Sequence, residues 1–225
     1  MESKSVQEAP IIVWFRQDLR LADNPALWQA CESGKIIPVY ILDDQSAGDW
    51  SMGGASRWWL HHALESLDKS LQNKLNIFKG DPLECLSHLT QVTEAKAVYW
   101  NRCYEPWRLE RDMQLKTDLK SLGLEVKSFN GSLLWEPWEI VKKDQTPYKV
   151  FTPYYRRGCL GHIPPRKPLS KPNNLNIPNK SECSLTVNCL KLLPQINWDS
   201  TMREVWTIDE QAADSLLDNF LVQGI

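Results

Sequence analysis

The sequence predicts an α/β fold, in which a five-stranded, doubly wound parallel sheet of the Rossmann-like type precedes a long proline-rich linker and the first helix of a missing helical domain. Two observations indicate this architecture. Five short apolar segments alternate with helix-forming segments between residues 11 and 129, and this alternation is typical of parallel sheets covered by helices. Seven prolines then fall between Pro147 and Pro178, which disfavours regular structure in that stretch.

The first strand and helix carry clear local signals. Residues 11–15 read IIVWF, an uninterrupted apolar run that is typical of a strand buried on both faces. Asn24 followed by Pro25 provides a helix cap and a first helical residue, and Gly34 provides the end of that helix. Residues 36–42 form the next apolar run and predict the second strand.

The rest of the sheet follows the same alternation. Three further strands are expected at residues 75–78, 97–100 and 124–129. Helices are expected over residues 55–73, from Pro82 onward, and from Pro106 to Gly123. Leucines spaced three and four residues apart give each of these helices one apolar face.

Composition divides the chain into four parts. We expect a disordered leader at residues 1–10, the α/β domain at 11–140, a connector at 141–200, and the start of a helical domain at 201–225. The aromatic segment 148–155 of the connector is expected to dock onto the α/β domain. The last helix is expected to begin with a capping box formed by Thr207 and Glu210. Its apolar face has no following segment to pack against, so the chain looks truncated.

Composition also limits the classes of function. No apolar run approaches the roughly 18 residues that span a bilayer, and residues 1–10 lack a signal-peptide core, so we expect a cytoplasmic monomer with no membrane contact. The six cysteines are scattered without a C-x-x-C pair, which predicts free thiols and no metal site. From Lys142 to Lys171 eight basic residues accompany one acid. This tract either contacts phosphates or is a solvated linker.

Polar residues follow three of the predicted strands. Arg16 and Asp18 follow the first strand, Asp43 follows the second, and Asn101 and Glu105 end or follow the fourth. In an open parallel sheet ligands bind at the carboxyl ends of strands, although a structural salt-bridge network is the alternative. Neither a G-x-G-x-x-G motif after the first strand nor a P-loop motif is present. The sequence therefore predicts a binding site without catalytic residues.

Four motifs, in order, resemble those of the DNA photolyase and cryptochrome family. Residues 14–24 read WFRQDLRLADN and are similar to the family's opening signature, W-F-R-x-D-L-R-x-x-D-N. Residues 55–60, ASRWWL, and residues 100–106, WNRCYEP, are similar to its second and third motifs. Residues 148–154, YKVFTPY, are similar to the segment that closes the family's amino-terminal antenna domain.

The resemblance implies an antenna domain that holds a light-absorbing chromophore. Asn101 and Glu105 match positions that contact the antenna chromophore in family members, and Arg57 matches a contact to deazaflavin in some of them. With Arg16, Asp18 and Asp43 at the same sheet edge, these residues form the expected chromophore site. Deazaflavin binders often carry Asp where this chain has Cys103, which favours methenyltetrahydrofolate over deazaflavin or flavin.

For the whole protein the resemblance implies a class I-like cyclobutane pyrimidine dimer photolyase. Such an enzyme repairs UV-damaged DNA by light-driven electron transfer from reduced FAD, and the dimer is flipped out of the duplex to reach the flavin. FAD and DNA would bind to the missing helical domain, so we expect this chain alone to be inactive, to bind no FAD and to lack specific DNA binding. A cryptochrome photoreceptor, a (6-4) photolyase and a stand-alone nucleotide-binding module are the alternatives.

Overall fold

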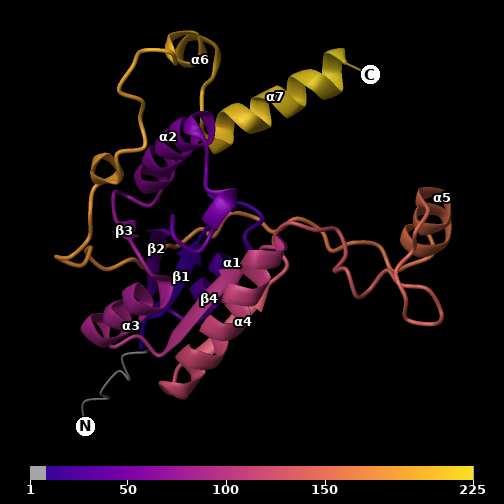
Figure 1. Ribbon diagram of the computed structural model, residues 1–225, viewed down its shortest axis with the longest axis horizontal. Helices are drawn as coiled ribbons and strands as arrows, with labels where there is room; N and C mark the ends of the chain where they lie inside the picture. Colours follow the sequence, from indigo (N-terminus) through magenta and orange to yellow (C-terminus); the bar gives the residue numbers. More distant parts are fainter. Residues whose placement is uncertain (1–8, 225) are drawn as a thin grey trace.

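The structure, a computed structural model, describes residues 9–224 and contains the expected parallel sheet (Figure 1). Its strands are β1 (Ile11–Phe15), β2 (Ile36–Leu42), β3 (Asn76–Lys79), β4 (Ala97–Asn101) and β5 (Glu125–Phe129). They pair in the order β3-β2-β1-β4-β5, and every pairing is parallel. The chain runs from β1 outward through β2 to β3 and then crosses to β4 on the other side of β1, so the strand order reverses beside β1. The predicted fold class is confirmed.

Four helices cover the two faces of the sheet. They are α1 (Pro25–Glu32), α2 (Gly54–Ser70), α3 (Pro82–Thr93) and α4 (Pro106–Ser121). Ile11, Val13 and Phe15 of β1 pack in one core cluster with α1 and α2. Ile12 and Trp14 pack in a second cluster with α3 and α4. The alternation of side chains along one strand therefore explains why both faces of the sheet are covered.

The helix boundaries reflect local capping. The side chain of Asn24 accepts a hydrogen bond from Leu27 N at 3.1 Å, as the sequence predicted for the start of α1. The expected helix over 55–73 ends earlier, at Ser70. Gln72 and Asn73 both have a φ of 59°, and this left-handed backbone conformation is incompatible with a continuing helix.

The connector contains more regular structure than its prolines suggested. Its short helices are α5 (Phe151–Pro153), η2 (Tyr154–Cys159), η3 (Val187–Leu190) and α6 (Ser200–Val205). One more short helix, η1 (Gly48–Trp50), lies outside the connector and precedes α2. The expected docking of residues 148–155 is wrong, because α5 lies away from the sheet (Figure 1) and Phe151 is 72% exposed. Phe151 stacks instead on Tyr155, with 5.8 Å between ring centroids.

The later part of the connector returns to the α/β domain. Ile177, Val187, Leu190 and Leu192 are buried in the same core cluster as α1 and α2. Leu185 N also donates a hydrogen bond to a carbonyl of β3 at 2.8 Å. The connector therefore adds packing to the domain, which a composition-based boundary at residue 140 did not anticipate.

The last helix, α7 (Glu210–Gln223), has a different cap from the expected one. Asp209 accepts from Ala212 N at 2.6 Å, so the predicted Thr207–Glu210 capping box is wrong. Glu210 instead accepts hydrogen bonds from the backbone amides of Leu21, at 3.0 Å, and Ala22, at 2.7 Å. These bonds fix the start of α7 to the loop between β1 and α1.

Three other expectations concern termini, thiols and membranes. Most of the leader expected at residues 1–10 lies outside the described residues. All six cysteines are free thiols, as predicted. Among residues 9–224, no helix has the length and apolar character needed to cross a bilayer.

Candidate functional site

A buried polar network joins the carboxyl ends of β1 and β4. The Asn101 side-chain amide donates to Asp18 Oδ2 at 2.5 Å and to Asn24 Oδ1 at 2.7 Å. Its carbonyl accepts from Ala26 N at 3.1 Å, and its main-chain oxygen accepts from the Arg16 guanidinium. Asp18 also accepts from Arg16 N at 2.9 Å. Asn101 and Asp18 thus hold the sheet edge together, which is the structural alternative considered for them.

Asp43, at the end of β2, is held by two elements. Its Oδ2 atom lies 3.0 Å from the Arg111 guanidinium of α4, and its Oδ1 accepts from Ser46 N at 2.9 Å. Burial alone would raise the pKa of Asp43, but the bonds from Ser46 and the charge of Arg111 outweigh it and hold the pKa below its ordinary value. Asp43 is therefore a fixed carboxylate at the edge of the site.

Arg57 belongs to a separate ion pair. Its guanidinium donates to both oxygens of Asp44, at 2.8 and 3.2 Å, and to the carbonyl of Met52 at 3.0 Å. These bonds hold the Arg57 guanidinium against the segment that precedes α2. Arg57 thus organises a loop beside the sheet edge.

A cavity of about 980 Å³ opens at this edge, which is a size typical of cofactor pockets. On the sheet side it is lined by Trp14, Arg16, Asp43, Trp107, Arg108 and Arg111. Opposite them it is lined by residues of α2 and of the segment that starts α7, including Trp59, Ala63, Trp206, Ile208 and Glu210. The Trp59 and Trp206 rings meet edge to face, 5.4 Å between centroids. The cavity therefore lies between the α/β domain and the last helix.

Guanidinium groups stack on the indoles of the sheet-side wall. The Cζ atom of Arg16 lies 4.9 Å from the ring centroid of Trp14, and that of Arg108 lies 4.8 Å from Trp107. Arg111 lies over both rings, at 5.1 and 5.2 Å. Such contacts fix the planes of both kinds of group. The wall is consequently a preformed surface of flat aromatic and cationic groups.

Three donors in this wall are unpaired. Trp14 Nε1, Arg16 Nε and Arg108 Nε are buried and have no hydrogen-bond partner among the described residues. Buried N–H groups are rarely left without an acceptor, and each exception calls for a bound acceptor or water. Because these nitrogens have almost no accessible surface, an acceptor in the cavity would reach them only after a side chain of the wall moves.

Glu105 lies next to this wall, at the N-terminus of α4. Its Oε1 atom accepts from Gln17 Nε2 at 2.8 Å and lies 3.6 Å from the Arg108 guanidinium. Its Oε2 atom is buried and has no partner in the described part of the chain. Burial would raise the pKa of Glu105, but bonds from its own backbone amide and from Gln17 lower it below its ordinary value.

Only two of the six predicted site residues line the cavity, Arg16 and Asp43. The other four lie outside its lining and are Asp18, Arg57, Asn101 and Glu105. Sequence reasoning missed the aromatic and cationic residues of α4 and the Trp59–Trp206 pair. The α4 residues could have been found, because Trp107, Arg108 and Arg111 occupy the first turns of a helix whose N-cap is Glu105 and whose first residue is Pro106. The Trp59–Trp206 contact joins distant segments and leaves no local signal.

Comparison with known proteins identifies the family. A profile of the family described as DNA photolyase matches residues 11–173. The deoxyribodipyrimidine photo-lyase of Agrobacterium fabrum is 41% identical over 222 residues, covering 96% of this chain and 46% of that protein. Cryptochrome-1 of Arabidopsis thaliana is 34% identical over 176 residues, covering 76% of this chain and 26% of the relative.

A solved structure agrees with these relatives. The crystal structure of a bacterial class III photolyase from Agrobacterium tumefaciens superposes with a TM-score of 0.88 at 39% identity, covering 97% of this chain and 45% of that one. The expected class I-like subtype is not confirmed by this likeness, and the chain spans about half the length of the photolyases it matches. The chain belongs to the DNA photolyase family, to whose amino-terminal domain its sheet, helices and motifs correspond.

Proposed function

We propose that this chain is the light-harvesting part of a deoxyribodipyrimidine photolyase and binds its antenna chromophore in the cavity between the sheet edge and α7. The observation that carries the proposal is the wall of stacked indole and guanidinium groups that lines this cavity. A flat aromatic ring would bury its faces against such a wall, and its anionic groups would pair with the guanidinium groups.

The residues fit methenyltetrahydrofolate, which we propose in preference to deazaflavin or flavin. Its flat ring can lie against the aromatic wall, and its glutamate carboxylates can pair with the guanidinium groups of Arg20, Arg108 or Arg111, which line the cavity. When bound, the chromophore would absorb light and pass the excitation energy to the flavin. The protein's contribution is to orient the ring by stacking and to exclude water from it.

We propose that the complete protein repairs cyclobutane dimers in UV-damaged DNA, using electron transfer from reduced FAD. Both FAD and the lesion would be held by the part of the relatives that lies outside the region matched here. A blue-light photoreceptor is the second candidate, because cryptochrome-1 of Arabidopsis thaliana matches 76% of this chain. We also propose that the protein works in the cytoplasm as a monomer.

The chromophore site is tested by titrating the purified chain with methenyltetrahydrofolate and following fluorescence. Arg108→Met removes an unpaired donor and a cation from the wall, and it should weaken binding ten- to a hundred-fold, about 1.5–3 kcal/mol. Arg157→Met is the matched control, because Arg157 is exposed and lies outside the cavity lining. Equal affinities of wild type and Arg108→Met would refute the site.

A Glu105→Gln variant separates a direct contact from a supporting role. Glu105 lies outside the cavity lining but neighbours Arg108. If the unpaired Oε2 atom binds the chromophore's amino group, Glu105→Gln should weaken binding as much as Arg108→Met. If Glu105 only positions Arg108, the loss should be several times smaller.

A further inference from the structure

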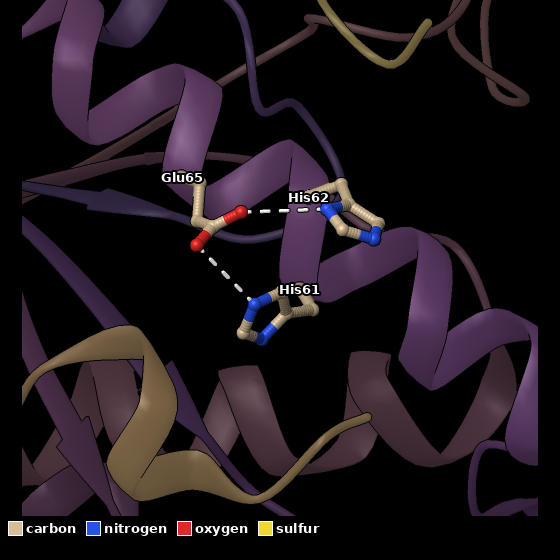
Figure 2. A group of neighbouring side chains, drawn as sticks. All are labelled: His61, His62 and Glu65. Atoms are coloured by element: carbon tan, nitrogen blue, oxygen red, sulfur yellow. Dashed lines mark hydrogen bonds and ion pairs between the residues drawn. The ribbon is translucent and has the colours of Figure 1, made fainter. Parts of the chain in front are cut away.

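Helix α2 carries a second group of polar side chains, which the proposed chromophore site does not use. His61, His62 and Glu65 come together on one side of the helix (Figure 2). The cavity is lined by other residues of the same helix, including Trp59, Ala63 and Ser66. The sequence predicted no metal site, because its cysteines form no C-x-x-C pair.

The three side chains converge on one point. His61 Nε2 lies 3.3 Å from Glu65 Oε1, and His62 Nδ1 lies 3.3 Å from Glu65 Oε2. One ligand atom from each residue can be chosen so that all lie within 4.8 Å of one another. Figure 2 shows both imidazole rings directed at the same carboxylate.

We propose that His61, His62 and Glu65 form a binding site for a divalent transition-metal ion of the zinc type. Two imidazole nitrogens and one carboxylate oxygen are a donor set that zinc, cobalt and nickel favour. Water would fill the remaining positions, because the Glu65 side chain is 51% exposed and opens the cluster to solvent. This site is independent of the proposed chromophore function.

The spacing of the donor atoms suits such an ion. Ligand atoms bonded to tetrahedral zinc at 2.0–2.1 Å stand about 3.3 Å apart, and each histidine nitrogen lies at that distance from one of the two Glu65 oxygens. Because the histidines reach different oxygens, binding of all three residues to one ion requires the exposed Glu65 side chain to rotate. A metal ion therefore requires only a small adjustment of one flexible residue.

The surroundings hold the rings in place for binding. The His61 side chain is 4% exposed, so the surrounding residues restrict its ring. The His62 ring meets buried Trp58 edge to face, with 4.7 Å between centroids. The far nitrogens, His61 Nδ1 and His62 Nε2, have no partner among the described residues. Among the described residues, a metal ion would therefore have to replace only the two contacts to Glu65, because the rings make no other hydrogen bond.

A second histidine–glutamate pair provides a matched control. Glu84 and His88 are also four residues apart on one helix, α3, but both are exposed, and among the described residues they belong to no group of three possible ligands. If spacing on a helix were enough for binding, this pair would bind an ion as well as the group on α2. Comparing the two pairs therefore isolates the contribution of the assembled site.

The experiment is a calorimetric titration of the purified chain with Zn²⁺, repeated with Co²⁺ under an absorbance readout. It is performed in a Cys183→Ser, Cys189→Ser background, because both thiols are exposed and could bind zinc. His62→Gln and Glu65→Gln each remove one ligand at a partly exposed position, so the fold should persist. His88→Gln is the control.

We expect one equivalent of metal, at least tenfold weaker binding in His62→Gln and in Glu65→Gln, and unchanged binding in His88→Gln. Circular dichroism of each variant verifies the fold. Absence of saturable binding, or equal affinity in all variants, would overturn the proposal. In that case the cluster would be a local hydrogen-bonded group on the helix.

Discussion

Replacing Asn101 with alanine tests the role of the polar network at the sheet edge. Asn101 is buried and uses its side chain in three hydrogen bonds, to Asp18, Asn24 and Ala26. The variant leaves the buried Ala26 N–H without an acceptor, a loss of about 1–3 kcal/mol. It also removes a donor from the Asp18 carboxylate, a loss of about 1.5–3 kcal/mol.

Because such losses are not additive, we expect the lower values to set the scale, about 2.5 kcal/mol in total. Urea unfolding followed by tryptophan fluorescence measures this change. Asn188→Ala is the control, since Asn188 is exposed and surface substitutions usually stay within about 0.5 kcal/mol. A loss below about 1 kcal/mol for Asn101→Ala would refute the structural role that we assign to the network.

Three further variants test other parts of the structure. Gly131→Ala should destabilise the fold by about 1–3 kcal/mol in urea unfolding, because an added Cβ would lie 2.7 Å from the Asn101 side chain. Asp43→Asn should lower the free energy of unfolding only where Asp43 is ionised, because folding lowers the pKa of Asp43. The loss of stability relative to wild type should be full above about pH 4 and should vanish as pH falls through the folded-state pKa. Glu210→Ala should speed hydrogen exchange of the two loop amides that Glu210 binds by at least tenfold, and mass spectrometry of the loop peptide measures it.

Each of these variants has a control that shares its chemistry. Gly53→Ala adds a Cβ where no atom lies within 4 Å, and Asp49→Asn and Glu204→Ala alter exposed acids. If Gly53→Ala destabilised as strongly as Gly131→Ala, the steric argument would be wrong. A pH-independent effect of Asp43→Asn would contradict its ion pair, and unchanged exchange in Glu210→Ala would show that other contacts hold the loop.

The fold could be predicted because its signals are local. Apolar runs such as residues 11–15 locate strands that are buried on both faces, and Asn24 and Asp81 cap their helices as short-range chemistry requires. The errors arose where distant segments meet. Glu210 was assigned to a cap within its own helix, but it binds the loop after β1, and no local pattern reveals that contact.

The strand-end rule points to the edge of the sheet at which the cavity opens, and Arg16 and Asp43 line that cavity. Binding of a ligand there stays a prediction. The rule cannot tell which polar residues turn inward, so Asn101 and Asp18 were assigned to the ligand although their bonds join β1 to β4. The opposite wall depends on how α7 docks, which only the three-dimensional structure reveals.

The most direct test of the account is a crystal structure of this chain grown with methenyltetrahydrofolate. We predict electron density for the ring in the cavity between the sheet edge and α7, in contact with the wall that contains Trp107, Arg108 and Arg111. Density for the ring elsewhere on the molecule, with this cavity empty, would contradict the account.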